Sequence, residues 1–330
     1  MWHSTVGCLI ILTLSLFVTP LATEAQQSGH IPVVGVLRPE NPSADFDPLS
    51  AFRQGLRELG YVEGQTIRLA YRFADGQGDR LPALAAELVS LQPDVIVTNA
   101  TLGALAAQHA TTTIPIVVAF ATDLVEAGLV ASLARPGGNL TGQHSRDLEV
   151  VGKLLELLKE AVPTMTSVAV LANLTGNPLA PGFASAFDAA AQALGVRLQL
   201  VEAGGPEAFD AAFATIATSG AEALLIQNDS MFTVHRQRLL DFAHAHRLPT
   251  ACNGRRYAEA GCLITYSANA LQMYRRAAVF VDKILKGAKP GDLPVERPNK
   301  FELVVNLKTA QALGVTFPPA LLFQADEVLK

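Results

Sequence analysis

Short apolar runs alternate with amphipathic stretches along most of the chain after residue 30. The runs consist mainly of Val, Ile, Leu and Ala, which is typical of parallel strands that are covered on both faces. This alternation predicts an α/β fold with parallel sheets and helices on both faces. The predicted strands are Val33–Leu37, Thr66–Tyr71, Val95–Thr98, Ile116–Ala119, Leu140–Gln143 as a crossover candidate, Val168–Leu171, Arg197–Val201, Ala223–Ile226, Pro249–Cys252 and Leu263–Tyr266.

The helical stretches indicate an internal repeat. Leu49–Leu59 has apolar residues at helical spacing and ends before Gly60, and Phe183–Leu194 does the same before Gly195, each a favoured position for a helix-ending glycine. Each helix is followed by a strand, a second helix and another apolar strand. We therefore expect two similar Rossmann-like lobes.

The lobe boundaries follow from breaks in the alternation. A Pro/Gly turn at 135–139 marks a first crossing, and a helix over Leu271–Leu285 leads through Gly287 into three prolines, which predicts another. We expect an N-terminal lobe of residues 26–145 plus about 268–295, and a C-terminal lobe of 146–267 plus about 296–330. A hinge of several strands would join them, as in the type 1 periplasmic-binding fold.

The first 25 residues have the pattern of a signal peptide. An unbroken run of apolar and small residues spans 8–18, and small residues lead up to Ala25, although residues 1–7 lack the usual Lys or Arg. About eleven apolar residues are too few to span a bilayer, which takes roughly 20. We expect Sec-dependent export with cleavage after Ala25, giving a secreted, periplasmic protein.

Composition excludes some classes of protein. Half of the 330 residues are hydrophobic, 17% are charged, and the net charge is −5 without a cluster of Lys or Arg, so neither disorder nor nucleic-acid binding is expected. Two cysteines remain after the signal, Cys252 and Cys262. They either form a disulfide or are small core residues of neighbouring strands, and the sequence favours the second interpretation.

Polar residues that follow the predicted strands are the candidate ligand contacts, because ligands of parallel sheets bind beyond the carboxyl ends of the strands. Asn, Thr, Ser and Asp offer hydrogen bonds in both directions, and aromatic residues offer walls. The same polar residue types also cap helices in any protein. The candidates are Arg38, Asn41, Asn99, Thr101, Phe120, Thr122, Asp123, Asn173, Asn228, Asp229, Ser230, Asn253, Tyr266 and Ser267.

Asp123 and Asp229 are the strongest of these candidates. Each directly follows an apolar strand and precedes a predicted helix, one in each lobe, so lobe closure would bring two carboxylates to one cleft. Such a pair would hold an ammonium group or sugar hydroxyls. Helix capping also explains either residue alone, and a loss of unliganded stability in Asp229→Ala would indicate that capping role.

Catalytic and cofactor motifs are not recognisable. Gly76-Gln-Gly78 lacks the third glycine of a dinucleotide-binding loop, and neither a phosphate-binding loop nor a nucleophile elbow is found. Three histidines lie on a polar helix predicted over Val234–Arg247, where a solvated face explains them. We expect no enzyme activity, no cofactor and no metal site.

Several segments resemble the ABC-transporter substrate-binding protein family with a type 1 periplasmic-binding fold, which includes tryptophan/tyrosine-type binding proteins. The resemblance covers nearly the whole mature chain. It is carried by FRQGLRELGYVEG at 52–64, LPALAAEL at 81–88, GLVASLARPGGNLTG at 128–142, VDKILKGAKP at 281–290 and FELVVNLKTA at 301–310.

The resemblance implies a soluble receptor that delivers a small solute to a permease and an ATPase encoded elsewhere. We also expect a monomer. It makes Asp123 and Asp229 candidates for a ligand ammonium group and Thr101 a candidate for a carboxylate. The ligand loops depart from the family pattern at Leu124, Cys252-Asn253 and Tyr266-Ser-Ala-Asn269. We therefore expect an amino acid or a similar small polar solute without naming it.

Two other classes of function stay open. A sensory module would bind the same ligand but dock on a membrane receptor, and neighbouring genes would distinguish it. An exported α/β enzyme would use Asp123 and Asp229 as an acid and base pair, and would show turnover and a raised pKa on one aspartate.

Overall fold

The first sheet has five parallel strands in the order β2-β1-β3-β4-β5. The computed structural model describes residues 30–41, 47–175, 177–298 and 300–330, so the predicted signal peptide lies outside the described residues. The strands are β1 Val33–Arg38, β2 Arg68–Phe73, β3 Val95–Thr98, β4 Ile116–Ala121 and β5 Leu140–His144.

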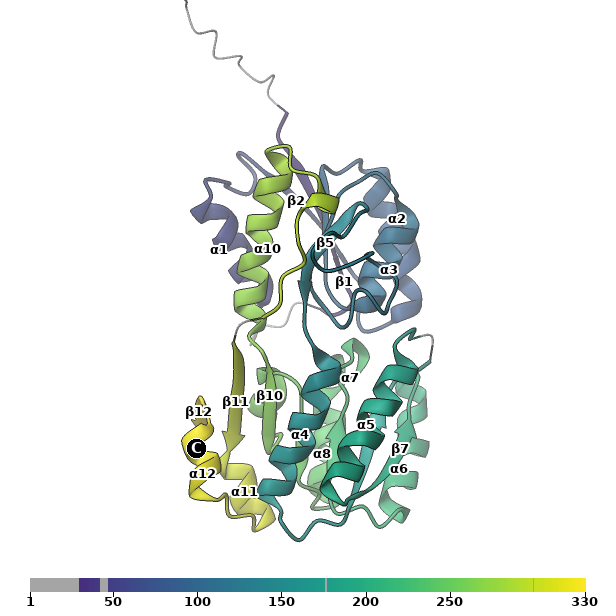
Figure 1. Ribbon diagram of the computed structural model, residues 1–330, viewed down its shortest axis with the longest axis vertical. Helices are drawn as coiled ribbons and strands as arrows, with labels where there is room; N and C mark the ends of the chain where they lie inside the picture. The colour runs from purple at the N-terminus through teal and green to yellow at the C-terminus, as the bar shows by residue number, and fades with distance from the viewer. Residues whose placement is uncertain (1–29, 42–46, 176, 299) are drawn as a thin grey trace, which may run out of the picture. The chain divides into compact units, whose positions relative to one another are not determined.

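Helices cover both faces of this sheet because its strands are apolar on both sides. Val34 and Val36 pack in one cluster with Phe52 of α1, whereas Leu37 packs in another with Leu88 of α2. Figure 1 shows α2 and α3 together on one side and α1 with α10 on the other. The helices are α1 Pro48–Glu58, α2 Leu81–Ser90, α3 Thr101–Ala110 and α10 Ala270–Leu285.

Helix α10 belongs to the first lobe although it comes late in the chain. Tyr274 and Ala278 are buried in the same cluster as Phe52. The two helices approach closely at Gly55, where a Cβ atom would lie 2.8 Å from the carbonyl oxygen of Arg275. A glycine is needed here for the distance between the helices and not for its backbone angles.

The second sheet has seven strands in the order β12-β11-β10-β9-β8-β6-β7. All neighbouring pairs are parallel except β10 and β11, which are antiparallel. The strands are β6 Ser167–Ala172, β7 Arg197–Glu202, β8 Leu224–Ile226, β9 Thr250–Cys252, β10 Ile264–Ala268, β11 Phe301–Asn306 and β12 Glu327–Leu329.

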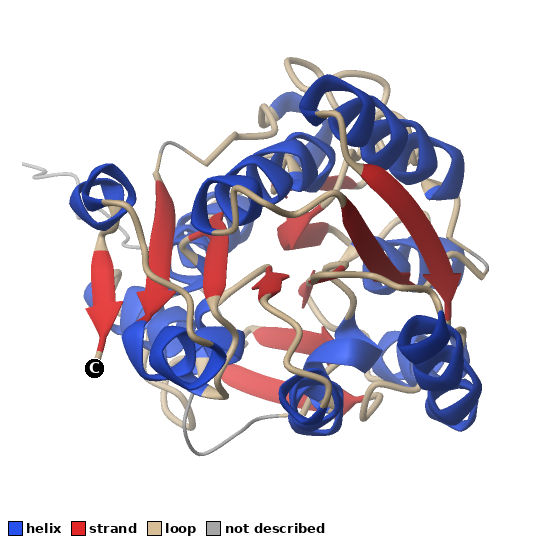
Figure 2. Ribbon diagram, turned by 90° about the horizontal axis from the view of Figure 1, so that it is seen from below, coloured by secondary structure: helices blue, strands red, loops and turns tan. Residues whose placement is uncertain are grey.

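This sheet is also enclosed by helices, as Figure 2 shows. Val170 of β6 packs with Leu154 and Phe187 on one face, and Leu171 packs with Phe209 on the other. The helices are α4 Asp147–Ala161, α5 Ala180–Leu194, α6 Phe209–Thr218, α7 Ser230–Val234, α8 Arg236–Ala245, α9 Arg255–Glu259, α11 Leu307–Leu313 and α12 Pro319–Gln324.

Three segments of the described chain connect the two lobes: one after β5, one between β10 and α10, and one before β11. The first and third pair with each other, because His144 N–H donates to the Glu296 carbonyl at 2.9 Å and Glu296 N–H donates to Gly142 at 2.9 Å. The α/β fold with two parallel-sheet lobes and a multi-strand hinge is confirmed.

The predicted strands occur close to their expected bounds, but the end of the chain was not predicted. Strands β11 and β12 extend the second sheet beyond β10. The polar helix expected over Val234–Arg247 is present as α8, Arg236–Ala245, which is two residues shorter at each end, and His235 separates it from α7.

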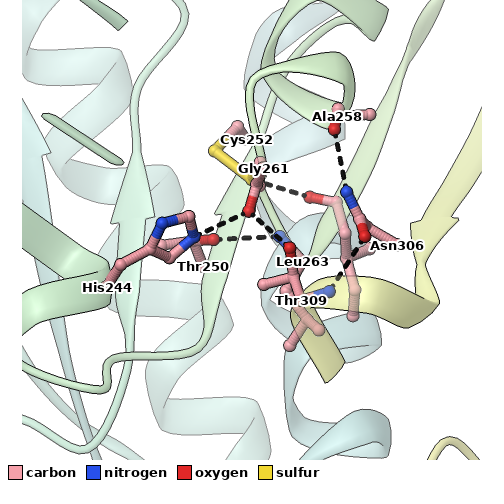
Figure 3. The surroundings of a disulfide bond; sticks show 10 residues. His244, Thr250, Cys252, Ala258, Gly261, Leu263, Asn306 and Thr309 are labelled. Atoms are coloured by element: carbon pink, nitrogen blue, oxygen red, sulfur yellow. Dashed lines mark hydrogen bonds between the residues drawn. A yellow bond between two sulfur atoms is a disulfide. The ribbon is translucent and has the colours of Figure 1, made fainter. Parts of the chain in front are cut away.

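Cys252 and Cys262 form a disulfide, which corrects the preference for two separate core residues. Both side chains are fully buried, so the bridge also fills core volume. Neighbouring hydrogen bonds hold the bridged turn: His244 Nε2 and Thr309 Oγ1 each lie 3.0 Å from the Gly261 carbonyl oxygen (Figure 3). The bridge ties β9 to the start of β10.

Candidate functional site

A cavity of about 790 Å³ lies between the two lobes, and we call it the large chamber. Its first-lobe wall comes from the segments after β1, β2, β3 and β4, and its second-lobe wall from those after β6, β7 and β8. These are carboxyl ends of parallel strands, where ligands of such sheets bind. The volume is within the range of small-molecule sites.

A second cavity of about 230 Å³, the small chamber, adjoins the hinge. The segment after β9 and the crossing from β10 to α10 form much of its wall. Both chambers are lined by Glu40, Phe120, Asp147 and Asn228. These four residues therefore stand between the two chambers.

Most of the predicted site residues line these chambers. Thr101, Thr122, Asn173, Asp229 and Ser230 line the large chamber. Arg38, Asn253 and Ser267 line the small chamber. Phe120 and Asn228 line both.

The structure places Asn41, Asn99, Asp123 and Tyr266 away from both chamber walls. Asn41 is exposed, and Tyr266 stacks on Phe301 with ring centroids 5.4 Å apart. The Asp123 carboxylate accepts hydrogen bonds from the N–H groups of Val125 and Glu126 at 3.0 and 3.1 Å. Asp123 thus closes its own turn, and the two-carboxylate cleft expected from Asp123 and Asp229 is not formed.

Asp229 caps α7 and lines the large chamber at the same time. Its Oδ1 accepts from the N–H groups of Met231 at 2.8 Å and Phe232 at 3.3 Å, and its Oδ2 accepts from Asn173 Nδ2 at 3.2 Å. Burial raises the pKa of this carboxyl group to about 6. An acid and base pair would also show a raised pKa, but Asp123, the partner expected for that role, bonds to its own turn instead.

Glu40 is a site residue that the sequence analysis missed. It is only 7% exposed, and its carboxylate accepts from Arg38 Nη2 at 3.1 Å and from Asn99 Nδ2 at 3.1 and 3.2 Å. Burial alone would raise the pKa of Glu40, but Arg38 and Asn99 lower it below its usual range. Its position after β1, at the predicted ligand edge, was the signal that could have identified it.

Asn99 supports this group from beneath the chamber. Its Oδ1 accepts from the hydroxyl of Tyr274 at 2.8 Å while its Nδ2 donates to Glu40. Tyr274 also lies under the guanidinium of Arg38, with 5.4 Å from Cζ to the ring centroid. A predicted ligand contact is therefore a positioning residue for Glu40.

Asp147 is the second residue that was missed. It is 6% exposed at the start of α4, after Arg146, whose φ of 60° is unusual for a residue with a side chain. Its Oδ2 accepts from Thr122 Oγ1 and Ser145 Oγ at 2.9 Å and from Asn228 Nδ2 at 3.0 Å. No sequence signal beyond the predicted crossing pointed to it.

Among the described residues, two direct side-chain contacts join the lobes at the partition between the chambers. Ser230 Oγ donates to Glu40 Oε1 at 2.9 Å, and Thr122 Oγ1 donates to Asp147 Oδ2 at 2.9 Å. Each contact pairs a hydroxyl of one lobe with a carboxylate of the other. The two lobes are therefore in direct contact across the chambers.

The described residues contain no group of three or more His, Cys, Asp or Glu side chains that could hold a metal ion. Among the same residues, no helix has the length and apolar character needed to cross a membrane.

A family model and a known relative match most of this chain. A family model described as ABC transporter substrate binding protein matches residues 34–329. The chain is 27% identical over 277 residues to a tyrosine-binding protein of Clostridioides difficile strain R20291, covering 84% of this chain and 79% of that one.

Two solved structures share the whole fold. A conserved domain protein of Vibrio cholerae O1 is 30% identical with a TM-score of 0.82, and the match covers 91% of this chain and all of that one. The ABC domain of Streptococcus pneumoniae in complex with L-Trp is 24% identical with a TM-score of 0.83 and the same coverage. Because the family model spans nearly the whole described chain, this protein belongs to the ABC transporter substrate binding protein family.

Proposed function

We propose that this protein is the solute-binding component of an ABC importer and holds a small polar solute between its two lobes. The observation that carries the proposal is the large chamber of about 790 Å³, whose wall is shared by both lobes. Substrate-binding proteins bind small-molecule solutes and work with ABC transporter components. The solute would pass from the closed lobes to a permease and an ATPase encoded elsewhere.

Ligand contacts in the large chamber would come from the polar side chains after the strands. Hydroxyl, amide and carboxylate groups of both lobes face one volume, so a bound solute gains its full set of contacts only when the lobes are closed. The proposed contacts are Thr101, Thr122, Asn173, Asn228, Asp229 and Ser230. Amino acids are the first solutes to test, since relatives of the chain are a tyrosine-binding protein and a domain in complex with L-Trp.

Closure would move two bodies about the three connecting segments. The proposed lobes are residues 26–145 plus 268–295 and residues 146–267 plus 296–330. Small torsion changes shared by three segments permit rotation without breaking either core. We propose that the protein acts as a monomer, because a single chain supplies both walls of the chamber.

Proteins of this family are extracellular or periplasmic. The proposed route for this chain is export by the signal peptide of residues 1–25, with cleavage after Ala25. N-terminal sequencing of the protein recovered from the periplasm would test the cleavage site.

The test of function is thermal unfolding of the purified mature chain against a library of amino acids, sugars, nucleosides and small acids. A ligand at about 100 times its Kd adds roughly 2.7 kcal/mol to the free energy of unfolding, which gives a measurable rise in Tm. The protein is first unfolded and refolded so that no copurified solute fills the chamber. A solute that raises Tm and keeps its mass supports the proposal; a solute that is converted, or a library without any hit, contradicts it.

A further inference from the structure

Arg38 is buried with donors that the described residues leave unused. Its side chain is at the wall of the small chamber and the residue is 2% exposed. Nη2 donates to Glu40 at 3.1 Å, but Nε and Nη1 have no hydrogen-bond partner in the part of the chain that the structure describes. Buried polar groups are nearly always paired, so two unpaired N–H groups on a buried cation require an explanation.

The guanidinium cannot avoid this cost by losing its proton. Burial alone would lower the pKa of Arg38, but Tyr274 and Glu40 beside it raise that pKa above its ordinary value. Removing one buried hydrogen-bond partner generally leaves the full desolvation penalty of the other. An acceptor that enters the small chamber would remove this penalty, and an anionic acceptor would gain most.

Asp147 presents the complementary group to the same chamber. Three neutral donors converge on Oδ2, while among the described residues Oδ1 accepts only from Asn253 Nδ2, at the long distance of 3.4 Å. Within the described residues, no Lys or Arg forms an ion pair with this carboxylate. Oδ1 therefore has acceptor capacity for a positively charged donor.

The size and wall of the small chamber limit what enters. The small chamber, at about 230 Å³ against about 790 Å³ for the large chamber, suits the compact polar head of a solute better than its body. Phe120, Leu271 and Met273 make part of the wall apolar. Phe120 also lines the large chamber, so a head in the small chamber and a body in the large chamber would both contact that ring.

We propose that the small chamber binds the zwitterionic head of the solute, with its carboxylate on Arg38 and its ammonium group on Asp147. This inference rests on the proposed function and adds the chemistry of the head to it. It departs from the placement implied by the family resemblance, which puts the carboxylate on Thr101 and the ammonium group on Asp123 and Asp229. Arg38 and Asp147 then determine specificity, and the large chamber receives the rest of the solute.

The experiment compares three forms of each amino acid that stabilises the protein: the amino acid, its amide and the acid that lacks the amino group. Titration calorimetry with the refolded wild-type protein is expected to give Kd values about 10- to 100-fold higher for the amide and for the des-amino acid. Arg38→Gln is expected to abolish the preference for the acid over the amide. Asp147→Asn is expected to abolish the preference for the amino acid over the des-amino acid.

Two further variants serve as controls for this test. The double variant R38Q/E40Q removes both charges of the buried pair, so it tests the same loss of preference where Arg38→Gln alone fails to fold. Arg275→Gln is the matched control, because Arg275 pairs with Glu58 on the exposed surface of the same lobe. This variant is expected to keep the wild-type preferences for the acid and for the amino acid.

The proposal is overturned where wild-type protein binds amide and acid with equal affinity, or where both Arg38 variants keep the preference for the acid. A library hit without any charged group would also overturn it while leaving the solute-binding function intact. A library without hits would reject the proposed function itself.

Discussion

The hydroxyl of Ser230, at the start of α7 in the second lobe, donates a 2.9 Å hydrogen bond to Glu40 Oε1, which follows β1 in the first lobe. The Glu40 carboxylate is held on the other side by Arg38 and Asn99, so its position is fixed within its own lobe. A hydroxyl that bonds to a fixed carboxylate of the opposite lobe stabilises the closed arrangement and contributes nothing once the lobes part.

Ser230→Ala is expected to weaken solute binding without unfolding the protein. A hydrogen bond to a charged group contributes about 1.5–3 kcal/mol, so Kd should rise about 10-fold or more for the solute identified by thermal screening. The radius of gyration of the ligand-free variant, measured by X-ray scattering, should exceed that of the wild type. Ser90→Ala is the control, because that exposed hydroxyl bonds to Glu87 within its own helix. A Kd within twofold of wild type would show that this contact does not hold the lobes.

Asp229 is expected to make the stability of the ligand-free protein fall as the pH rises. Its pKa is raised from 3.8 to about 6 in the folded protein, so folding favours the protonated carboxyl group. The stabilisation is therefore fully present below about pH 4 and is lost as the pH rises through about 6, by at most about 3 kcal/mol. Urea unfolding of wild type and Asp229→Asn at pH 5, 6, 7 and 8 would measure the difference.

The asparagine variant keeps a good N-cap for α7, so subtracting its stability isolates the charge. If the free energy of unfolding changed with pH in the same way for wild type and Asp229→Asn, the raised pKa of Asp229 would be ruled out. Asp229→Ala is expected to be about 1 kcal/mol less stable than Asp229→Asn at every pH in this range, because it removes the cap itself.

Reduction of the Cys252–Cys262 bridge is expected to lower the free energy of unfolding by about 2–3 kcal/mol, the loss of loop-closure entropy for cysteines separated by 10 positions. Thermal unfolding with and without a thiol reductant would show the decrease. A Cys252→Ala/Cys262→Ala double variant should be insensitive to reductant. An equal response of both proteins would mean that the reductant acts elsewhere.

Gly55→Ala is expected to destabilise the first lobe by about 1–3 kcal/mol, because a Cβ atom would lie 2.8 Å from the Arg275 carbonyl oxygen and α1 would be forced away from α10. Gly152→Ala is the matched helical control. Its Cβ would meet Ala190 only at 3.9 Å, so helix propensity should stabilise this variant by up to about 1 kcal/mol. Chemical unfolding should therefore show a lower free energy of unfolding for Gly55→Ala and a higher one for Gly152→Ala.

The sequence contained most of the fold because the strands are apolar on both faces. Val95–Thr98 has the bounds that its apolar run predicts, and the Gly195 stop ends α5 as expected. Strand β11 was missed since its first residues are only half-buried and it follows a proline-rich segment. Its antiparallel pairing with β10 departs from the simple alternation on which the strand predictions rested.

The site was only partly predictable for a different reason. Residue type and position after a strand were enough to predict that Asn228 and Ser230 line the site. They do not determine the direction in which a carboxylate side chain points. Asp123 bonds to its own turn, whereas Asp147 turns toward Thr122 of the other lobe. That choice depends on side-chain torsions and on the left-handed backbone at Arg146, neither of which a sequence pattern specifies.

The path of the chain between the lobes gives them different completion times during synthesis. Both large cores of the second lobe consist of residues 150–262, so they can close as soon as that stretch has emerged. The first lobe begins earlier, yet one face of its sheet needs Tyr274, Ala278 and Val281 of α10. The first lobe therefore cannot cover this face until most of the second lobe has been made, and its uncovered sheet is the surface on which a chaperone would act in a nascent chain.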